Sequence, residues 1–192
     1  MSKKLTRICV YCGSNSGIRP EYLESAIQLG KFLAEQKIEL VYGGAKIGLM
    51  GAVATATMNN GGKVIGVMPE PFIKDLAHNN LTELHAVPTM HERKKIMFDL
   101  SDGFITLPGG IGTIEEIFEI LTWGQLGFHE KPCGLLNVCG YFDNMLKFIE
   151  HSIHQQFVKP EYQSMILVDS EIKNLLVQFE KYKSIKIKKW ID

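Results

Sequence analysis

Two stretches of the sequence carry residue types that could perform chemistry on a phosphorylated ligand. The first is a glycine-rich turn, Gly109–Thr113, whose glycines let the backbone approach a ligand and present N–H groups to an anion. The second is the basic pair Arg93 and Lys94, in which the forked arginine donors suit phosphate or ribose. Glu115 and Glu116 follow the turn, and either carboxylate could face the ligand and take part in chemistry.

A strand, a sharp turn and a helix are predicted to position these groups. Residues 104–107 read as a buried strand, and apolar residues recur at helical spacing from Ile114 to Leu121. Thr113 is predicted to cap this helix and to offer its hydroxyl to the same anion. Glu115 and Glu116 then fall in the first helical turn, where the simpler interpretation is a charge that complements the helix dipole. Arg93 and Lys94 fall on a separate predicted helix, residues 90–100.

The rest of the chain alternates strand and helix patterns. A second glycine-rich turn, residues 43–51, strengthens the case for a nucleotide phosphate site. Pro69 and Pro71 predict an irregular connection that runs through Asn80. The alternation predicts an α/β fold, a Rossmann-like doubly wound parallel sheet with helices on both faces. The pattern does not fit a dehydrogenase, because no GxGxxG follows the first strand and no acidic residue closes the second.

Length and composition limit the classes of function. The 192 residues predict a single domain, 1–192, with 45% hydrophobic and 22% charged residues, and we find no linker or repeat. The formal net charge is zero, so no basic field favours a nucleic acid or an anionic membrane. No apolar run is long enough to span a bilayer, and the start of the chain lacks a signal-peptide pattern. We expect a cytoplasmic protein.

The cysteines and histidines predict neither a metal site nor a cofactor. Cys9 and Cys12 resemble a CxxC pair, but they lie in a strand pattern, where positions three apart point to opposite faces. We interpret both as buried structural thiols. His151 and His154 share a helix face without a carboxylate partner, and His78 reads as a solvated or capping side chain. The alternating residues 183–189 read as an exposed strand or a solvated tail.

Several motifs together resemble one known family. PGGIGTIEE, residues 108–116, resembles the PGGxGTxxE signature of the LOG family, the cytokinin-activating phosphoribohydrolases once mislabelled lysine decarboxylases. The segments 90–94 and 122–127 match the same family, as do 131–137, 11–14, 41–44 and 48–51. The resemblance covers most of the chain, from about residue 5 to about residue 170, and is far more specific than a lone glycine motif.

This resemblance implies roles for individual residues. Arg93 and Glu116 match the family's catalytic arginine and glutamate. Asp75 stands where relatives commonly carry a substrate-contacting glutamate, and Ile111 stands where plant members have tyrosine. The family's other nucleotide-contacting positions correspond to Lys94, Gly109, Gly110, Ile111, Gly112, Thr113, Ile114, Glu115 and Thr122.

The expected reaction is hydrolysis of the N-glycosidic bond of a nucleoside 5′-monophosphate. The resemblance implies AMP or N6-prenyl AMP as substrate, and free adenine or cytokinin with ribose 5-phosphate as products. It also implies a homodimer with no cofactor and no metal. The helix after the turn is predicted to supply the interface through an apolar surface wider than one sheet contact needs, comprising Ile117, Phe118, Ile120, Leu121 and Trp123.

Three other interpretations remain open. A nucleotide-binding carrier of the same fold, similar to the molybdenum-cofactor carriers, would bind AMP without forming products. A lysine decarboxylase would need pyridoxal phosphate on a lysine, which an absorbance spectrum would reveal. An oligomeric scaffold would leave both glycine turns and the placement of Arg93 and Glu116 unexplained.

Overall fold

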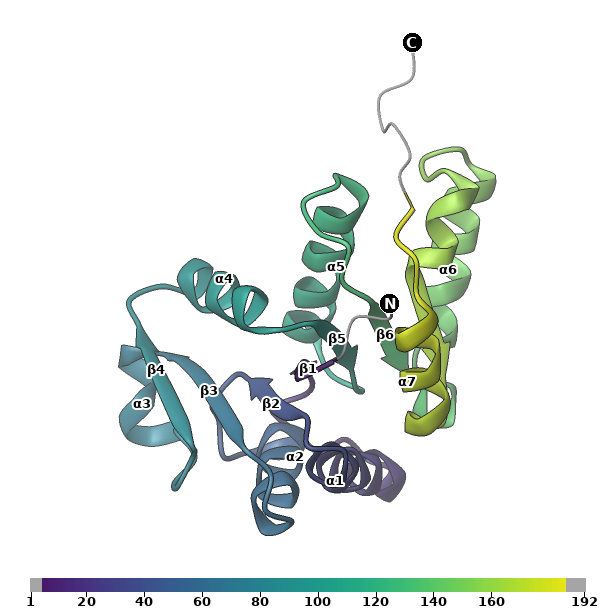
Figure 1. Cartoon of the computed structure of the whole chain (residues 1–192). Coiled ribbons are helices and arrows are strands. Elements are labelled where there is room, and N and C mark those ends of the chain that lie inside the picture. The colour runs from purple at the N-terminus through teal and green to yellow at the C-terminus, as the bar shows by residue number, and fades with distance from the viewer. Residues whose placement is uncertain (1–4, 186–192) are drawn as a thin grey trace.

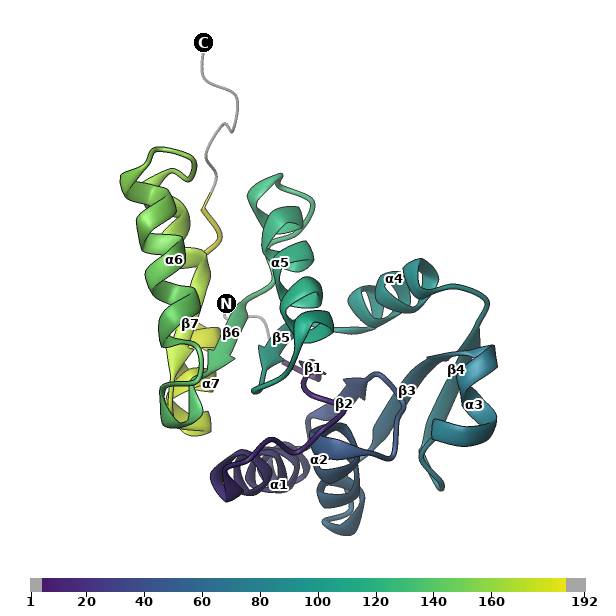
Figure 2. The same cartoon turned by 180° about the vertical axis from the view of Figure 1, so that it is seen from behind.

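The fold is built on one seven-stranded parallel sheet. The computed structural model describes residues 5–185. The strands lie in the order β4-β3-β2-β1-β5-β6-β7, which can be followed in Figures 1 and 2. Their bounds are β1 Arg7–Tyr11, β2 Glu39–Tyr42, β3 Val64–Pro69, β4 Glu83–Val87, β5 Gly103–Thr106, β6 Cys133–Leu136 and β7 Ile166–Asp169.

Seven α-helices and two short 3₁₀ helices connect the strands of the described chain. The α-helices are α1 Pro20–Glu35, α2 Gly48–Asn59, α3 Glu70–Leu76, α4 Met90–Leu100, α5 Ile111–Gln125, α6 Asp143–His154 and α7 Ile172–Lys181. The 3₁₀ helices are η1 Val138–Gly140 and η2 Pro160–Met165. Within residues 5–185, no helix is long and apolar enough to cross a membrane.

The helices cover both faces of the sheet, so the predicted doubly wound fold is confirmed (Figures 1 and 2). The helices α1, α2 and α7 bury Leu29, Val53 and Leu175 in one core, while α4 and α5 bury Met97 and Ile117 in the other. The two cysteines of the CxxC pattern are both buried, Cys9 in the second core and Cys12 in the first. This confirms that they point to opposite faces.

The order of the strands places a crevice beside β1. From the central strand β1 the chain moves outward through β2, β3 and β4, and then returns to β5 on the other side of β1. After β1 the chain therefore continues to α1 on one face of the sheet, and after β5 it continues to α5 on the other face. Ligands of open α/β sheets bind at such a switch point.

Two predictions about local structure were wrong. The connection predicted as irregular after Pro69 contains α3, because Pro69 is the N-cap and Pro71 lies in the first turn, where a missing N–H costs nothing. Thr113 does not cap α5: Gly110 is the N-cap, and Thr113 is a buried residue of the first turn. Glu115 and Glu116 therefore lie in the second turn, beyond the strongest influence of the helix dipole.

The apolar surface predicted on α5 is only partly exposed. Ile117 and Ile120 are each 1% exposed, and Leu121 is 9% exposed, because they pack against the sheet in the second core. Phe118 and Trp123 are half-buried. The prediction for residues 183–189 lies beyond the described chain from residue 186 onward.

Candidate active site

Three loops meet at the carboxyl edge of the sheet. The Gly13 N–H, after β1, donates a hydrogen bond to the Pro108 carbonyl at 3.0 Å, just before the glycine turn. The Leu49 N–H, at the start of α2, donates to the Gly13 carbonyl at 3.1 Å. The loop after β1 thus anchors both glycine-rich turns at the switch point.

The turn before α5 is tightly packed at one glycine and open at two others. A methyl group at Gly109 would overlap the Thr113 hydroxyl and approach the Gly13 nitrogen to 2.8 Å. A methyl group at Gly110 or Gly112 would meet nothing within 4 Å. The backbone is therefore held firmly at Gly109, and free space lies over the N-terminus of a 15-residue helix. Such a helix end favours an anion.

A buried ion pair lies beside this turn. Arg93, on α4, donates from Nη1 to Oε1 of Glu116, on α5, at 2.9 Å, and from Nε to the Val67 carbonyl at 3.0 Å. Both side chains of the pair are 11% exposed. Thr89 fixes the start of α4, because its hydroxyl accepts the Glu92 N–H at 3.2 Å.

The absence of a side chain at Gly43 leaves room for the Arg93 guanidinium. A Cβ atom at Gly43 would overlap Arg93 Nη2 and lie 3.2 Å from the guanidinium carbon. The second glycine-rich turn therefore provides the space in which the arginine reaches Glu116.

Burial and the neighbouring arginine change the pKa of Glu116 in opposite directions. Removal from water raises the pKa of Glu116 above its ordinary range, while the Arg93 charge and hydrogen bond act in the opposite direction. A carboxylate held this way faces a cation but is poorly solvated. It can accept a proton or stabilise positive charge that develops nearby.

The neighbouring glutamate has a different partner. Lys94 is 8% exposed, and its ammonium group donates to Glu115 and, at 3.0 Å, to Glu119. Burial alone lowers the pKa of Lys94, but the hydrogen bonds to these two carboxylates outweigh burial and raise it. The structure thus separates the adjacent glutamates, with Glu116 on Arg93 and Glu115 on Lys94.

The other predicted site residues lie apart from the ion pair. Ile111 and Ile114 are 89% and 37% exposed at the start of α5. Asp75 is exposed on α3. Thr122 donates its hydroxyl to the Phe118 carbonyl at 2.7 Å and lines a groove between α5 and α6. None of the contacts among the described residues joins Asp75 or Thr122 to Arg93 or Glu116.

The histidines make no metal cluster in the described part of the chain. Within residues 5–185, no group of three or more His, Cys, Asp or Glu side chains is placed to hold a metal ion. His151 and His154 are exposed on α6. His78 is tied locally, with Nε2 at 2.9 Å from the Thr55 hydroxyl and Nδ1 at 2.7 Å from the Asn79 carbonyl.

Sequence reasoning missed a cavity next to the glycine turn. It has a volume of about 290 Å³ and is walled by the Gly13–Gly17 loop, Leu49, Pro108–Gly110, Tyr22 and Tyr141. The turn residues 13–17 follow the first strand, where open α/β sheets bind ligands, so the sequence did indicate this wall as a ligand-facing loop. No signal pointed to Tyr141, whose hydroxyl donates to the Gly109 carbonyl at 2.6 Å across 32 residues of sequence.

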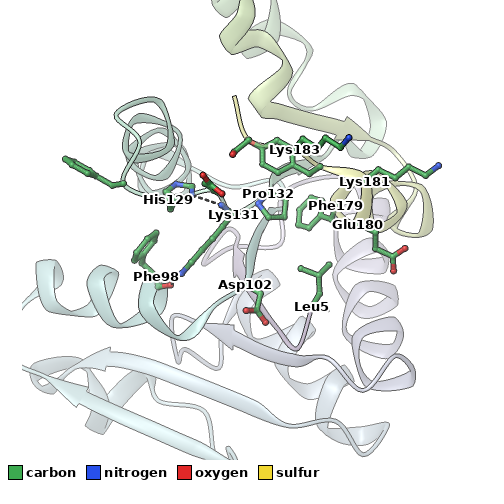
Figure 3. A pocket seen from close by; sticks show the side chains of 14 residues that line it. Leu5, Phe98, Asp102, His129, Lys131, Pro132, Phe179, Glu180, Lys181 and Lys183 are labelled. Atoms are coloured by element: carbon green, nitrogen blue, oxygen red, sulfur yellow. Dashed lines mark hydrogen bonds between the residues drawn. The ribbon is translucent and has the colours of Figure 1, made fainter. Parts of the chain in front are cut away.

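A larger cavity, of about 1160 Å³, lies at the opposite, amino edge of the sheet (Figure 3). Lys131 extends through it toward Phe98, donating to the Phe98 carbonyl at 2.6 Å and lying 3.9 Å from the centre of that ring. The Lys131 N–H donates to His129 Nδ1 at 3.0 Å. None of the predicted site residues lines this cavity.

Fold and site together define a class of protein. The chain is a doubly wound α/β protein whose open glycine turn and largely buried arginine–glutamate pair lie at the carboxyl edge of the sheet. Residues 50–179 match the model of a family described as "Possible lysine decarboxylase". The chain belongs to this family, the LOG family.

Curated relatives match nearly the whole chain. The cytokinin riboside 5′-monophosphate phosphoribohydrolase LOG7 of Arabidopsis thaliana is 46% identical over 93% of this chain and 83% of its own length. The cytokinin riboside 5′-monophosphate phosphoribohydrolase of Rhodococcoides fascians is 46% identical over 88% of this chain and 86% of its own length. The sequence similarity therefore extends beyond the motifs to nearly the whole chain.

Solved structures share the fold at lower identity. The molybdenum cofactor binding protein of Rippkaea orientalis matches with a TM-score of 0.71 and 22% identity, covering 94% of this chain and 98% of that one. The molybdenum cofactor carrier protein of Chlamydomonas reinhardtii matches with a TM-score of 0.68 and 22% identity, covering 91% and 99%. At this identity the similarity concerns the fold alone.

Proposed function

We propose that the protein is a nucleoside 5′-monophosphate phosphoribohydrolase, which hydrolyses the N-glycosidic bond of AMP or an N6-modified AMP. The observation that carries the proposal is the buried Arg93–Glu116 pair beside the open glycine turn. Curated relatives at 43–46% identity are named for this reaction on cytokinin riboside 5′-monophosphates.

The turn binds the phosphate in this proposal. The residues Gly109, Gly110, Ile111, Gly112 and Thr113 supply backbone N–H groups at the positive end of α5. Binding energy from the phosphate then fixes the ribose against the reacting groups, so a nucleoside without phosphate should react poorly. By family match, Asp75, Lys94, Ile114, Glu115 and Thr122 complete the substrate contacts.

Glu116 and Arg93 perform the chemistry. As the bond between C1′ and the base breaks, its electrons move to the base and positive charge develops on the ribose. The Glu116 carboxylate stabilises this charge or accepts a proton from the attacking water. The water oxygen bonds to C1′ and one of its protons ends on the base, giving free base and ribose 5-phosphate. Arg93 holds the carboxylate in place and keeps it ionised.

The experiment is adenine release measured by chromatography. The purified protein is incubated with AMP, N6-prenyl AMP, other nucleoside monophosphates and adenosine. We expect free base from AMP or its N6-prenyl form and none from adenosine. Equal rates on AMP and adenosine would contradict a site that depends on the phosphate. The relative rates on AMP and N6-prenyl AMP then define the preferred base.

A homodimer is part of the proposal. An apolar groove of about 260 Å³ lies between α5 and α6, lined by Phe118, Leu121 and Thr122 among others, and Phe148 on its rim is 65% exposed. Thr122 lies about 18 Å along α5 from Gly110 at 1.5 Å per residue. In a two-fold dimer formed through this face, Thr122 would lie beside the partner subunit. Its family role in substrate contact would then be served at the partner's site, although Thr122 lies far from the glycine turn of its own subunit.

Two alternatives make different predictions. A nucleotide carrier would bind AMP without releasing adenine, and only its fold finds support in the solved structures. A decarboxylase would need an accessible, neutral lysine for a Schiff base. Lys94, the lysine beside the ion pair, is buried between two carboxylates that raise its pKa. It does not fit that requirement.

A further inference from the structure

Tyr141 reaches the glycine turn from outside the motif. It follows η1, and its hydroxyl donates to the Gly109 carbonyl at 2.6 Å. Edge-on contacts with Tyr22, at 5.5 Å between ring centres, and with Phe142, at 5.0 Å, hold the tyrosine ring. Phe142 is 1% exposed, so one side of this aromatic group is anchored in the core. Tyr141 itself is 39% exposed, and these two ring contacts together with the hydrogen bond hold its hydroxyl on the turn.

This hydrogen bond controls the direction of a peptide group. In a trans peptide the carbonyl and the following N–H point in opposite directions. Tyr141 holds the Gly109 carbonyl, so the Gly110 N–H is turned away from the tyrosine. The Gly13 N–H holds the Pro108 carbonyl at 3.0 Å and orients the Gly109 N–H in the same way. Both carbonyls of the turn are thus held by hydrogen bonds, and each following N–H faces away from the donor.

The turn needs such an external restraint. A peptide between two glycines has no side chain to oppose its rotation, and glycine tolerates both signs of φ. If the Gly109–Gly110 peptide rotated, its carbonyl oxygen would face the anion in place of the N–H. A methyl group at Gly110 would meet no atom within 4 Å, so the packing around that side of the peptide is loose.

We propose that Tyr141 is a positioning residue for the substrate phosphate, which holds the Gly109–Gly110 peptide with its N–H directed at the anion. The inference rests on the proposed function, because it assigns the phosphate to this turn. It adds to the site a residue that lies outside the PGGxGTxxE segment and touches the turn only through the backbone.

The test removes the hydroxyl and keeps the ring. In Tyr141→Phe we expect KM for AMP to rise about 2- to 10-fold, the effect of one hydrogen bond, with kcat within about twofold of the parent. The inhibition constant of ribose 5-phosphate should rise by the same factor, and that of adenosine, which has no phosphate, should not change. Tyr182→Phe, at the amino edge of the sheet, is the matched control and should change none of these values.

The outcomes separate this inference from the proposed function. If the parent binds AMP without releasing adenine, the hydrolase proposal fails, and calorimetric affinities for AMP and adenosine still decide the role of Tyr141. Unchanged AMP affinity in Tyr141→Phe overturns the inference. Equal weakening of AMP and adenosine, or a lower melting temperature with unchanged affinities, identifies a structural role and also overturns it. A parent protein without affinity for AMP overturns both proposals.

Discussion

A single methyl group at Gly43 should disable the site although no charged residue is replaced. In Gly43→Ala the new Cβ would occupy the position of Arg93 Nη2, so the guanidinium must move. The displaced arginine loses its bonds to Glu116 at 2.9 Å and to the Val67 carbonyl at 3.0 Å. Glu116 is then left buried without a cation, which disfavours the ionised form that the reaction needs.

The magnitude follows from these bonds. A hydrogen bond to a charged group contributes about 1.5 to 3 kcal/mol. Loss of the Arg93–Glu116 bond alone therefore corresponds to a decrease in turnover of about 10- to 150-fold, at about 1.36 kcal/mol per factor of ten. The assay is adenine release from AMP under steady-state conditions, with urea unfolding to establish that the variant is folded.

A double-mutant cycle identifies the cause. Arg93→Ala removes the group that the methyl displaces, so adding Gly43→Ala to it should lower turnover by no more than about twofold. If the two substitutions multiply in their effects, Gly43 acts independently of Arg93, and displacement of the guanidinium is refuted as the cause. Parental turnover in Gly43→Ala would refute it more simply.

Three further predictions concern pH, stability and assembly. Because burial raises the pKa of Glu116, turnover should fall with acid at a pH above the ordinary glutamate pKa of about 4.3. Above that value the folded state keeps a proton on Glu116 that the unfolded state releases, so the contribution of Glu116 to the free energy of unfolding should decrease as pH rises through its raised pKa, and Glu116→Gln should remove this contribution. Lys94→Met leaves the Glu115 and Glu119 carboxylates without their cation and should lower the free energy of unfolding, measured in urea, by about 2 kcal/mol. An unchanged free energy of unfolding would show that these two ion pairs do not stabilise the fold. Phe148→Glu should yield a folded monomer by light scattering, and a persistent dimer would exclude the α5–α6 face.

The order of the elements was predictable because its signals are local. The helix predicted over residues 90–100 is α4, Met90–Leu100, and the strand predicted before the glycine turn is buried throughout. Boundaries were less accurate where backbone geometry decides them. The helix after the glycine turn, whose apolar spacing begins at Ile114, already begins at Ile111, because Gly110 takes the extended conformation of an N-cap.

The site was predictable in its residue types but not in its pairings. The family resemblance named Arg93 and Glu116, but periodicity alone could not choose between the two glutamates, because adjacent residues on a helix differ by about 100°. The position of α4 relative to α5 decides which carboxylate meets the arginine. Gly43 leaves the space that the distant Arg93 occupies, and Tyr141 donates a hydrogen bond to the backbone carbonyl of the distant Gly109. Such contacts leave no periodicity in the chain.

Thr113 illustrates a local rule that tertiary packing overrides. Threonine is a favoured N-cap residue, but the helix begins earlier in the chain, with Gly110 as its cap. Thr113 is instead packed against Gly109, where its hydroxyl fills the space that a glycine leaves. The close approach explains why residue 109 has no side chain.

The most direct test of the central claim is adenine release by Glu116→Gln, measured together with calorimetric affinity for AMP. The substitution keeps the shape of the side chain and removes its charge. We expect turnover to fall by about 100-fold or more, since a positioned acid–base group contributes at least that much, while AMP affinity stays within about threefold because the turn and Arg93 remain. Glu180→Gln, on the exposed face of α7, is the control for the same chemical change. If Glu116→Gln releases adenine at the parental rate, the proposed hydrolase mechanism is wrong.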